Sequence, residues 1–142
     1  MGLVIDTNVF IDAQDGRFAL EHLADFAHYG EGYIAAISVS ELLAGVHLAA
    51  TPTQRVQRAA FVEGLIGNMP VLDFTEAVAR VYAELYAHFL RPRGQMKGRV
   101  HELQIAATGI AHGFAVLTSN REDFKQIPGL RDRKSTRLNS SH

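Results

Sequence analysis

Short apolar runs alternate with longer segments of helical periodicity along most of the chain. The longer segments carry apolar residues three and four positions apart, which is typical of helices that bury one face. They cover about 18–29, 38–46, 54–67, 75–89 and 100–112. The short runs are predicted to be strands, because they are rich in branched side chains and stop at polar or turn residues. They lie at residues 3–5, 33–36, 71–72 and 115–118.

This alternation predicts an α/β domain built on a short, mostly parallel sheet of four or five strands with helices on both faces. Residues 6–8 are predicted to form a polar turn after the first strand. A short helix near residues 123–124 is expected to close the body of the domain.

The segment 132–142, with the sequence DRKSTRLNSSH, differs from the rest of the chain. It is polar and shows no apolar period, and it resembles a translated adapter sequence. A native disordered tail is the alternative interpretation. The domain is therefore expected to span residues 1–131, and residues 132–142 are expected to be a non-native or disordered tail.

Composition narrows the class of protein. The chain has no cysteine, which excludes disulfides and cysteine-based zinc sites. No apolar run approaches the roughly 20 residues that cross a bilayer, and the start MGLVIDTN lacks the basic region of a signal peptide, so a cytoplasmic protein is expected. The net charge of −1 disfavours a passive nucleic-acid binder. It counts less against a nuclease, where metal ions supply positive charge at the phosphate.

Polar side chains follow the predicted strand ends. Asp6 ends the first strand, Glu41 lies in the first turn of the helix after the second, and Glu102 lies in the first turn of the helix before the fourth. Asn120 and Asp123 follow the fourth strand. Parallel sheets bind ligands beyond the carboxyl ends of their strands. Clustered carboxylates repel one another unless a cation is present, and hard oxygen ligands suit Mg²⁺ or Mn²⁺. The pattern therefore indicates metal-assisted phosphodiester hydrolysis.

Each of these residues also has a structural interpretation. Asp6 is a possible helix cap, and Glu41 and Glu102 are acids of the kind that favour a helix N-terminus. Asn120 suits a turn, and Asp123 suits a solvated or capping position. No single position decides between the two interpretations, so the local sequences around them matter.

Four of these local sequences resemble the motifs of PIN-domain proteins, and in particular of the VapC toxins of type II toxin–antitoxin pairs. They are VIDTNVFID at 4–12, SVSELLAG at 38–45, ELQIAAT at 102–108 and LTSNREDF at 117–124. The segment IPGL at 127–130 resembles the usual closing segment. The motifs occur in order and span nearly the whole body, from residue 1 to about 130.

The resemblance implies a three-layer α/β/α fold and an endoribonuclease that depends on Mg²⁺ or Mn²⁺. It also implies RNA as substrate, a cognate antitoxin as partner and a homodimer. By position, Asp6, Glu41 and Glu102 form the metal-binding acidic centre, and Asn120 takes the fourth place. Two departures stand out: the third motif usually has aspartate where this chain has Glu102, and the amide of Asn120 brings no charge. Asp123 is the candidate to assist at the fourth place.

Further residues are candidates to support the site. Hydroxyl and amide side chains near the strand ends are expected to orient ligands or water: Thr7, Asn8, Ser38 and Thr118. A basic loop is expected to hold RNA phosphates or an acidic antitoxin segment, with a solvated loop as the alternative: Arg91, Arg93, Lys97 and Arg99. His101 adjoins Glu102, which suits an acid–base role, but a surface histidine is the preferred interpretation. The stripe Tyr82, Leu85, Tyr86 and Phe89 is expected to be core or a dimer contact.

Two hypotheses from different classes follow. The first is a metal-dependent endoribonuclease. The second is a catalytically weak module that binds RNA or a protein on the same fold, which the departures at Glu102 and Asn120 favour. A phosphatase that uses Asp6 as nucleophile is disfavoured, because such enzymes need a second aspartate at position 8, where this chain has Asn8.

Overall fold

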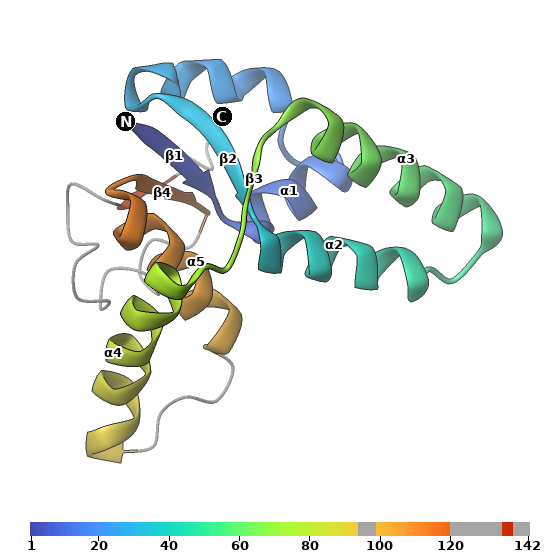
Figure 1. Ribbon diagram of the computed structural model, residues 1–142. Coiled ribbons are helices and arrows are strands. Elements are labelled where there is room, and N and C mark those ends of the chain that lie inside the picture. Colours follow the sequence, from blue (N-terminus) through green and yellow to red (C-terminus); the bar gives the residue numbers. More distant parts are fainter. Residues whose placement is uncertain (94–98, 120–134, 138–142) are drawn as a thin grey trace.

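The computed structural model describes residues 1–93, 99–119 and 135–137 (Figure 1). All of its strands are parallel and form one sheet in the order β3-β2-β1-β4-β5. The first strand along the chain is therefore central in the sheet. The strands are β1 (Gly2–Ile5), β2 (Glu31–Ala35), β3 (Val71–Leu72), β4 (Ala115–Thr118) and β5 (Ser135–Arg137).

Helices connect β1, β2, β3 and β4 in turn and cover both faces of the sheet (Figure 1). The described helices are α1 (Thr7–Gln14), η1 (Leu20–Tyr29), α2 (Ala36–His47), α3 (Pro52–Asn68), α4 (Glu76–Arg93) and α5 (Val100–His112). The segment η1 is a 3₁₀ helix, whereas the others are α-helices. No helix in the described ranges is both long enough and apolar enough to span a membrane.

Side chains alternate across β1, and this alternation divides the core into two layers. Val4 faces a cluster that α4 and α5 complete with Val78, Leu85 and Leu103. The opposite face of β1, with Leu3 and Ile5, packs against α1, α2 and α3 through Phe10, Leu42, Val62 and their neighbours. The three-layer α/β/α arrangement expected from the sequence is therefore confirmed.

Two glycines end helices and return the chain to the sheet. Gly113 takes a left-handed conformation, with φ of +69°, at the end of α5, which is the usual helix stop. Gly30 follows η1 with φ of +111°. A Cβ atom at Gly30 would lie 2.7 Å from the carbonyl of Met1, so only glycine allows β1 and β2 to approach at this point.

The prediction of a turn at residues 6–8 was wrong, because α1 begins at Thr7 directly after β1. This helix has only two turns, too few to show a clear period, and tertiary burial of Val9 and Phe10 holds it in place. The structure also starts α2 at Ala36, before Ser38. Glu41 therefore lies in the second turn of α2, not the first. Thr75 accepts a hydrogen bond from the backbone N–H of Val78 at 3.3 Å, as expected of a cap for α4.

The segment 132–142 was set apart from the domain on its sequence. Three of its residues, Ser135–Arg137, pair with β4 as the edge strand β5, and the others lie outside the described residues. The short helix expected near 123–124 also lies outside them.

Candidate active site

Asp6 lies where β1 ends and α1 begins, between the carboxyl ends of β1 and β4. Its backbone N–H donates to the carbonyl of Leu117 at 2.8 Å. The hydroxyl of Thr118 donates to Asp6 Oδ2 at 2.8 Å, and both side chains are buried. Asp6 occupies the N-cap position of α1, but its side chain makes no capping hydrogen bond within the described chain. The backbone N–H groups of Thr7 and Asn8 favour its charged form, but a capping role alone does not explain why this carboxyl is buried and bonded to Thr118.

Burial and a nearby like charge make Asp6 difficult to ionise. Its pKa rises from the ordinary 3.8 to about 6, mainly because burial penalises the charged form. The hydrogen bond from Thr118 lowers the pKa, the negative charge of Glu41 raises it, and the backbone N–H groups of Thr7 and Asn8 lower it. The site thus brings Asp6 and Glu41 close enough for their charges to oppose each other.

Glu41 reaches the same region from α2, and donors hold both of its carboxylate oxygens. Thr7 donates from its hydroxyl to Oε1 at 2.7 Å, and His101 Nδ1 lies 2.9 Å from Oε2. Thr7 has only one hydroxyl hydrogen, which this bond uses. The buried hydroxyl of Ser38, 2.8 Å from that of Thr7, must therefore donate to Thr7. The result is a chain of bonds from Ser38 through Thr7 to Glu41.

Glu102 lies in the first turn of α5 and forms an ion pair with a residue of the expected basic loop. Arg99 Nη2 is 3.0 Å from Glu102 Oε1, and the two side chains are only 20% and 18% exposed. The guanidinium of Arg99 also lies 4.6 Å from the ring centre of Phe89 on α4. The structure therefore places Arg99 at the N-cap of α5, against Glu102 and Phe89, and of the two interpretations of the basic loop, the solvated one does not hold for this residue.

Of the other residues that the sequence proposes for the site, some lie in the part of the chain that the structure describes and others do not. Thr118 and Ser38 lie in the site as given above, whereas Asn8 is exposed on α1. In the stripe on α4, Leu85 is buried, Phe89 packs against the core, and Tyr86 is 40% exposed. Several candidates lie outside the described residues or have side chains outside them: Asn120, Asp123, Arg91, Arg93 and Lys97.

The donor chemistry of the described site fits a hard divalent cation. Asp6, Glu41 and Glu102 offer carboxylate oxygens, which Mg²⁺ and Mn²⁺ prefer. A cation beside Asp6 would oppose both causes that raise its pKa, namely burial and the charge of Glu41. In the described ranges, however, no three side chains of His, Asp or Glu are close enough together to hold a metal as they stand. Mg²⁺ commonly rests on one or two carboxylates and keeps several waters, so water and substrate oxygens would complete its coordination here.

Sequence reasoning missed the bonds that hold Glu41. Thr7 was expected to orient Asp6 or water, yet its hydroxyl contacts Glu41, which lies 34 positions along the chain. His101 was interpreted as a surface histidine, and it is 55% exposed, but it contacts Glu41 across 60 positions. The only signal in the sequence was adjacency, since Thr7 follows Asp6 and His101 precedes Glu102.

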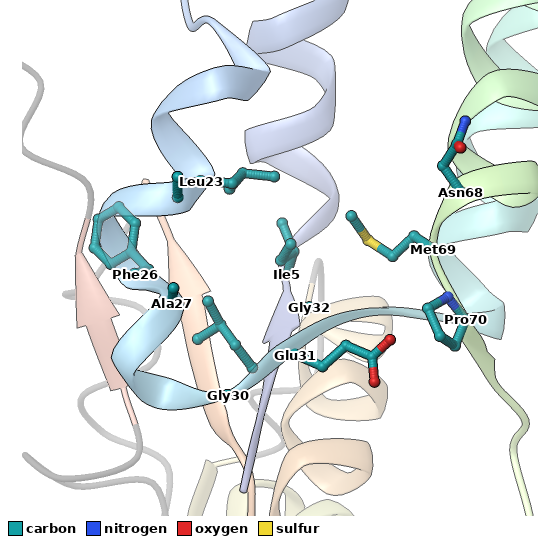
Figure 2. Close-up of a pocket in the computed structure, with 12 residues that line it drawn as sticks. Ile5, Leu23, Phe26, Ala27, Gly30, Glu31, Gly32, Asn68, Met69 and Pro70 are labelled. Carbon is teal, nitrogen blue, oxygen red and sulfur yellow. The ribbon is translucent and has the colours of Figure 1, made fainter.

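Two apolar cavities lie away from these carboxylates. One, of about 300 Å³, lies between η1, β1, the start of β2 and the end of α3, and Figure 2 shows Leu23, Phe26 and Met69 around it. The other, of about 400 Å³, lies between η1 and α3. The cavities share Leu23, Asn68 and Met69. Their linings contain a single ionisable side chain, Glu31, so they suit apolar contact and not hydrolysis.

Comparisons with known proteins agree with this fold. The PIN domain family matches residues 3–130. The ribonuclease VapC1 of Rickettsia felis is 35% identical over 130 residues, which cover 92% of this chain and 93% of that protein. The chain therefore belongs to the PIN-domain family. Within that family it belongs to the VapC proteins, which include the Rickettsia felis ribonuclease.

Solved structures show the same fold. The structure of VapBC2 from Rickettsia felis bound to a DNA fragment from its promoter matches with a TM-score of 0.82 and 21% identity, over 98% of this chain and 100% of that one. DNA-bound VapBC from Salmonella typhimurium matches with a TM-score of 0.75 and 26% identity, over 92% and 96%.

Proposed function

We propose that this chain is a metal-dependent endoribonuclease that hydrolyses RNA phosphodiester bonds, and that it is the toxin of a toxin–antitoxin pair. The observation that carries the proposal is the pairing of a buried Asp6 with Glu41 at the carboxyl edge of the sheet. The family supports the choice of reaction, since the Rickettsia felis relative is a ribonuclease.

In this proposal Asp6, Glu41 and Glu102 hold Mg²⁺ or Mn²⁺. The bound ion supplies Lewis-acid polarisation of the phosphoryl oxygen and a lowered pKa for the attacking water. The other residues keep these carboxylates in place: Thr118 fixes Asp6, and the chain from Ser38 through Thr7 fixes Glu41. Asn120 is proposed to position water or substrate on the evidence of its motif alone.

Charge is the physical reason to propose a metal-dependent reaction. RNA phosphates are anions, and the described carboxylates would repel them. Arg99 offsets part of the charge of Glu102 through its ion pair, but the charge of Glu41 still raises the pKa of Asp6. A divalent cation would reverse the sign of the potential where the phosphate must bind.

The partners are proposed on separate grounds. The VapBC complexes of known structure support an antitoxin as partner, and the two apolar cavities beside η1 offer the kind of surface that a partner helix or extended segment buries. Exposed apolar side chains on and before α4, Phe74, Tyr86 and Leu90, support a homodimer. The basic residues Arg91, Arg93 and Lys97 are proposed to contact RNA phosphates or an acidic antitoxin segment.

The test compares RNA cleavage by the wild type, Asp6→Asn and the control Asp12→Asn in Mg²⁺. Asp12 lies on α1 and forms an ion pair with the exposed Arg17. Its substitution removes an aspartate that makes none of the contacts described for the site. Asp6→Asn should reduce cleavage roughly 100-fold or more, equivalent to about 2.7 kcal/mol of barrier, and Asp12→Asn should leave it unchanged. Undiminished cleavage by Asp6→Asn would refute the mechanism.

A catalytically weak binding module is the second candidate, because Arg99 already engages the third carboxylate, Glu102. The same assay separates the two functions. A module would bind labelled RNA and leave it uncut at saturating Mg²⁺ and Mn²⁺, and its expression would not be toxic.

A further inference from the structure

His101 ties the first turn of α5 to a carboxylate on another helix. Its Nδ1 atom lies 2.9 Å from Glu41 Oε2, although the two residues are 60 positions apart. The histidine side chain is 55% exposed and that of Glu41 is 29% exposed. The contact therefore lies at the rim of the site, where solvent reaches one side of the pair.

The donor and acceptor properties of the two groups decide the direction of this hydrogen bond. An ionised carboxylate can only accept, so the hydrogen is on Nδ1 of His101 and the bond runs from the ring to Glu41. On the inner side, the hydroxyl of Thr7 donates to the other oxygen, Oε1, at 2.7 Å. Glu41 is thus held from the rim by α5 and from the interior by α1.

This arrangement leaves Glu41 able to bind a cation. Each carboxylate oxygen can accept at two positions, so one donor on each oxygen leaves a position on each for a metal. A glutamate has three side-chain torsions, and ordering them upon metal binding has an entropic cost. Donors that order the side chain beforehand lower this cost, which is how outer partners of ligating carboxylates tune metal affinity.

We propose that His101 is a positioning residue for Glu41, and that it raises the affinity of the site for its divalent cation by fixing the carboxylate from the rim. The inference rests on the proposed function, because it takes Glu41 as a metal ligand. The opposite role is competition, in which His101 occupies an oxygen that the metal needs. Competition predicts a change in affinity of the opposite sign, so one measurement separates the two.

The experiment measures Mn²⁺ binding to the full chain, with free Mn²⁺ followed by electron paramagnetic resonance. Four proteins are compared: the wild type, His101→Ala, His101→Asn and the control His47→Ala. Asparagine can place an amide N–H near the position of Nδ1, so it tests rescue by a donor. His47 is an exposed histidine at the other end of the helix that carries Glu41.

We expect His101→Ala to weaken Mn²⁺ binding about 10-fold, His101→Asn to recover most of the loss, and His47→Ala to match the wild type. The thermal midpoint of metal-free His101→Ala should stay close to that of the wild type, which shows that the variant is folded. At saturating Mn²⁺, RNA cleavage by His101→Ala should return towards the wild-type rate, because only the affinity has changed.

Three results would overturn the inference. Unchanged Mn²⁺ affinity in His101→Ala would remove the positioning role, and tighter binding would show competition. Cleavage that stays low at saturating Mn²⁺ would mean that His101 contacts the reacting groups. Failure of the wild type itself to bind Mn²⁺ is distinct from these, since it would refute the proposed metal chemistry and the inference with it.

Discussion

Asp6→Asn should stabilise the metal-free protein at neutral pH, even though it is expected to reduce cleavage roughly 100-fold or more. Burial and the charge of Glu41 raise the pKa of Asp6 from 3.8 to about 6. Each unit of difference between the folded and unfolded pKa corresponds to about 1.4 kcal/mol in the free energy of unfolding. Ionised Asp6 therefore lowers the free energy of unfolding by about 3 kcal/mol above pH 6. Asparagine carries no charge, and its side-chain oxygen can still accept the hydrogen bond from Thr118.

The sign follows from proton binding. Between the two pKa values the folded protein binds more protons at Asp6 than the unfolded chain does, so stability falls as pH rises. The contribution of protonated Asp6 is fully present below pH 3.8 and is lost as pH passes about 6. The free energy of unfolding of Asp6→Asn lacks this dependence on pH at position 6. The difference in free energy of unfolding between variant and wild type should therefore increase by roughly 1 kcal/mol from pH 5 to pH 7.

Urea denaturation in the presence of EDTA measures the effect at several pH values between about 5 and 8. Asp12→Asn is the control, because Asp12 pairs with Arg17 at the surface, where the side chain of Arg17 is 62% exposed, and surface pairs contribute little. The reasoning about Asp6 would be refuted if the difference in free energy of unfolding did not depend on pH, or if Asp6→Asn were less stable than the wild type at pH 8.

Two further predictions concern the neighbours of the carboxylates. Thr118→Val should raise the pKa of Asp6 further above 6, because the hydrogen bond from Thr118 favours the ionised form; NMR titration of ¹³C-labelled aspartate checks this, and an unchanged or lower pKa would contradict it. Arg99→Gln should destabilise the metal-free protein by about 1 kcal/mol in urea denaturation, since it removes both the ion pair with Glu102 and the contact with Phe89. A loss below about 0.3 kcal/mol would show that neither contact matters.

Local patterns predicted most of the elements but not all of their boundaries. The strands at 3–5, 71–72 and 115–118 and the helix at 100–112 agree with β1, β3, β4 and α5 within one residue. These elements have a clear period or end at a glycine or polar residue. The two-turn helix α1 is too short to show a clear period, and its position depends on burial of Phe10 against the sheet.

The residues of the candidate site could be proposed from the sequence, but the contacts between them could not. The motifs identified Asp6, Glu41 and Glu102 as candidates, because each motif is local in sequence. The bonds from Thr7 and His101 to Glu41 depend on how α1, α2 and α5 are rotated about their axes. Tertiary packing sets these rotations, and a periodicity of apolar residues defines a helix face only coarsely. Arg99 illustrates the same limit, since its pairing with Glu102 depends on where α5 begins.

The central position of β1 has a consequence for the newly made protein. β1 leaves the ribosome well before its neighbour β4, which is made more than 100 residues later. Asp6 receives its hydrogen bond from Thr118 only after that pairing. A nascent or prematurely ended chain therefore lacks the assembled carboxylate site, and such long-range pairing makes folding slow. Under the proposed function, a chain in which β4 has not yet been made therefore leaves RNA beside the ribosome uncut.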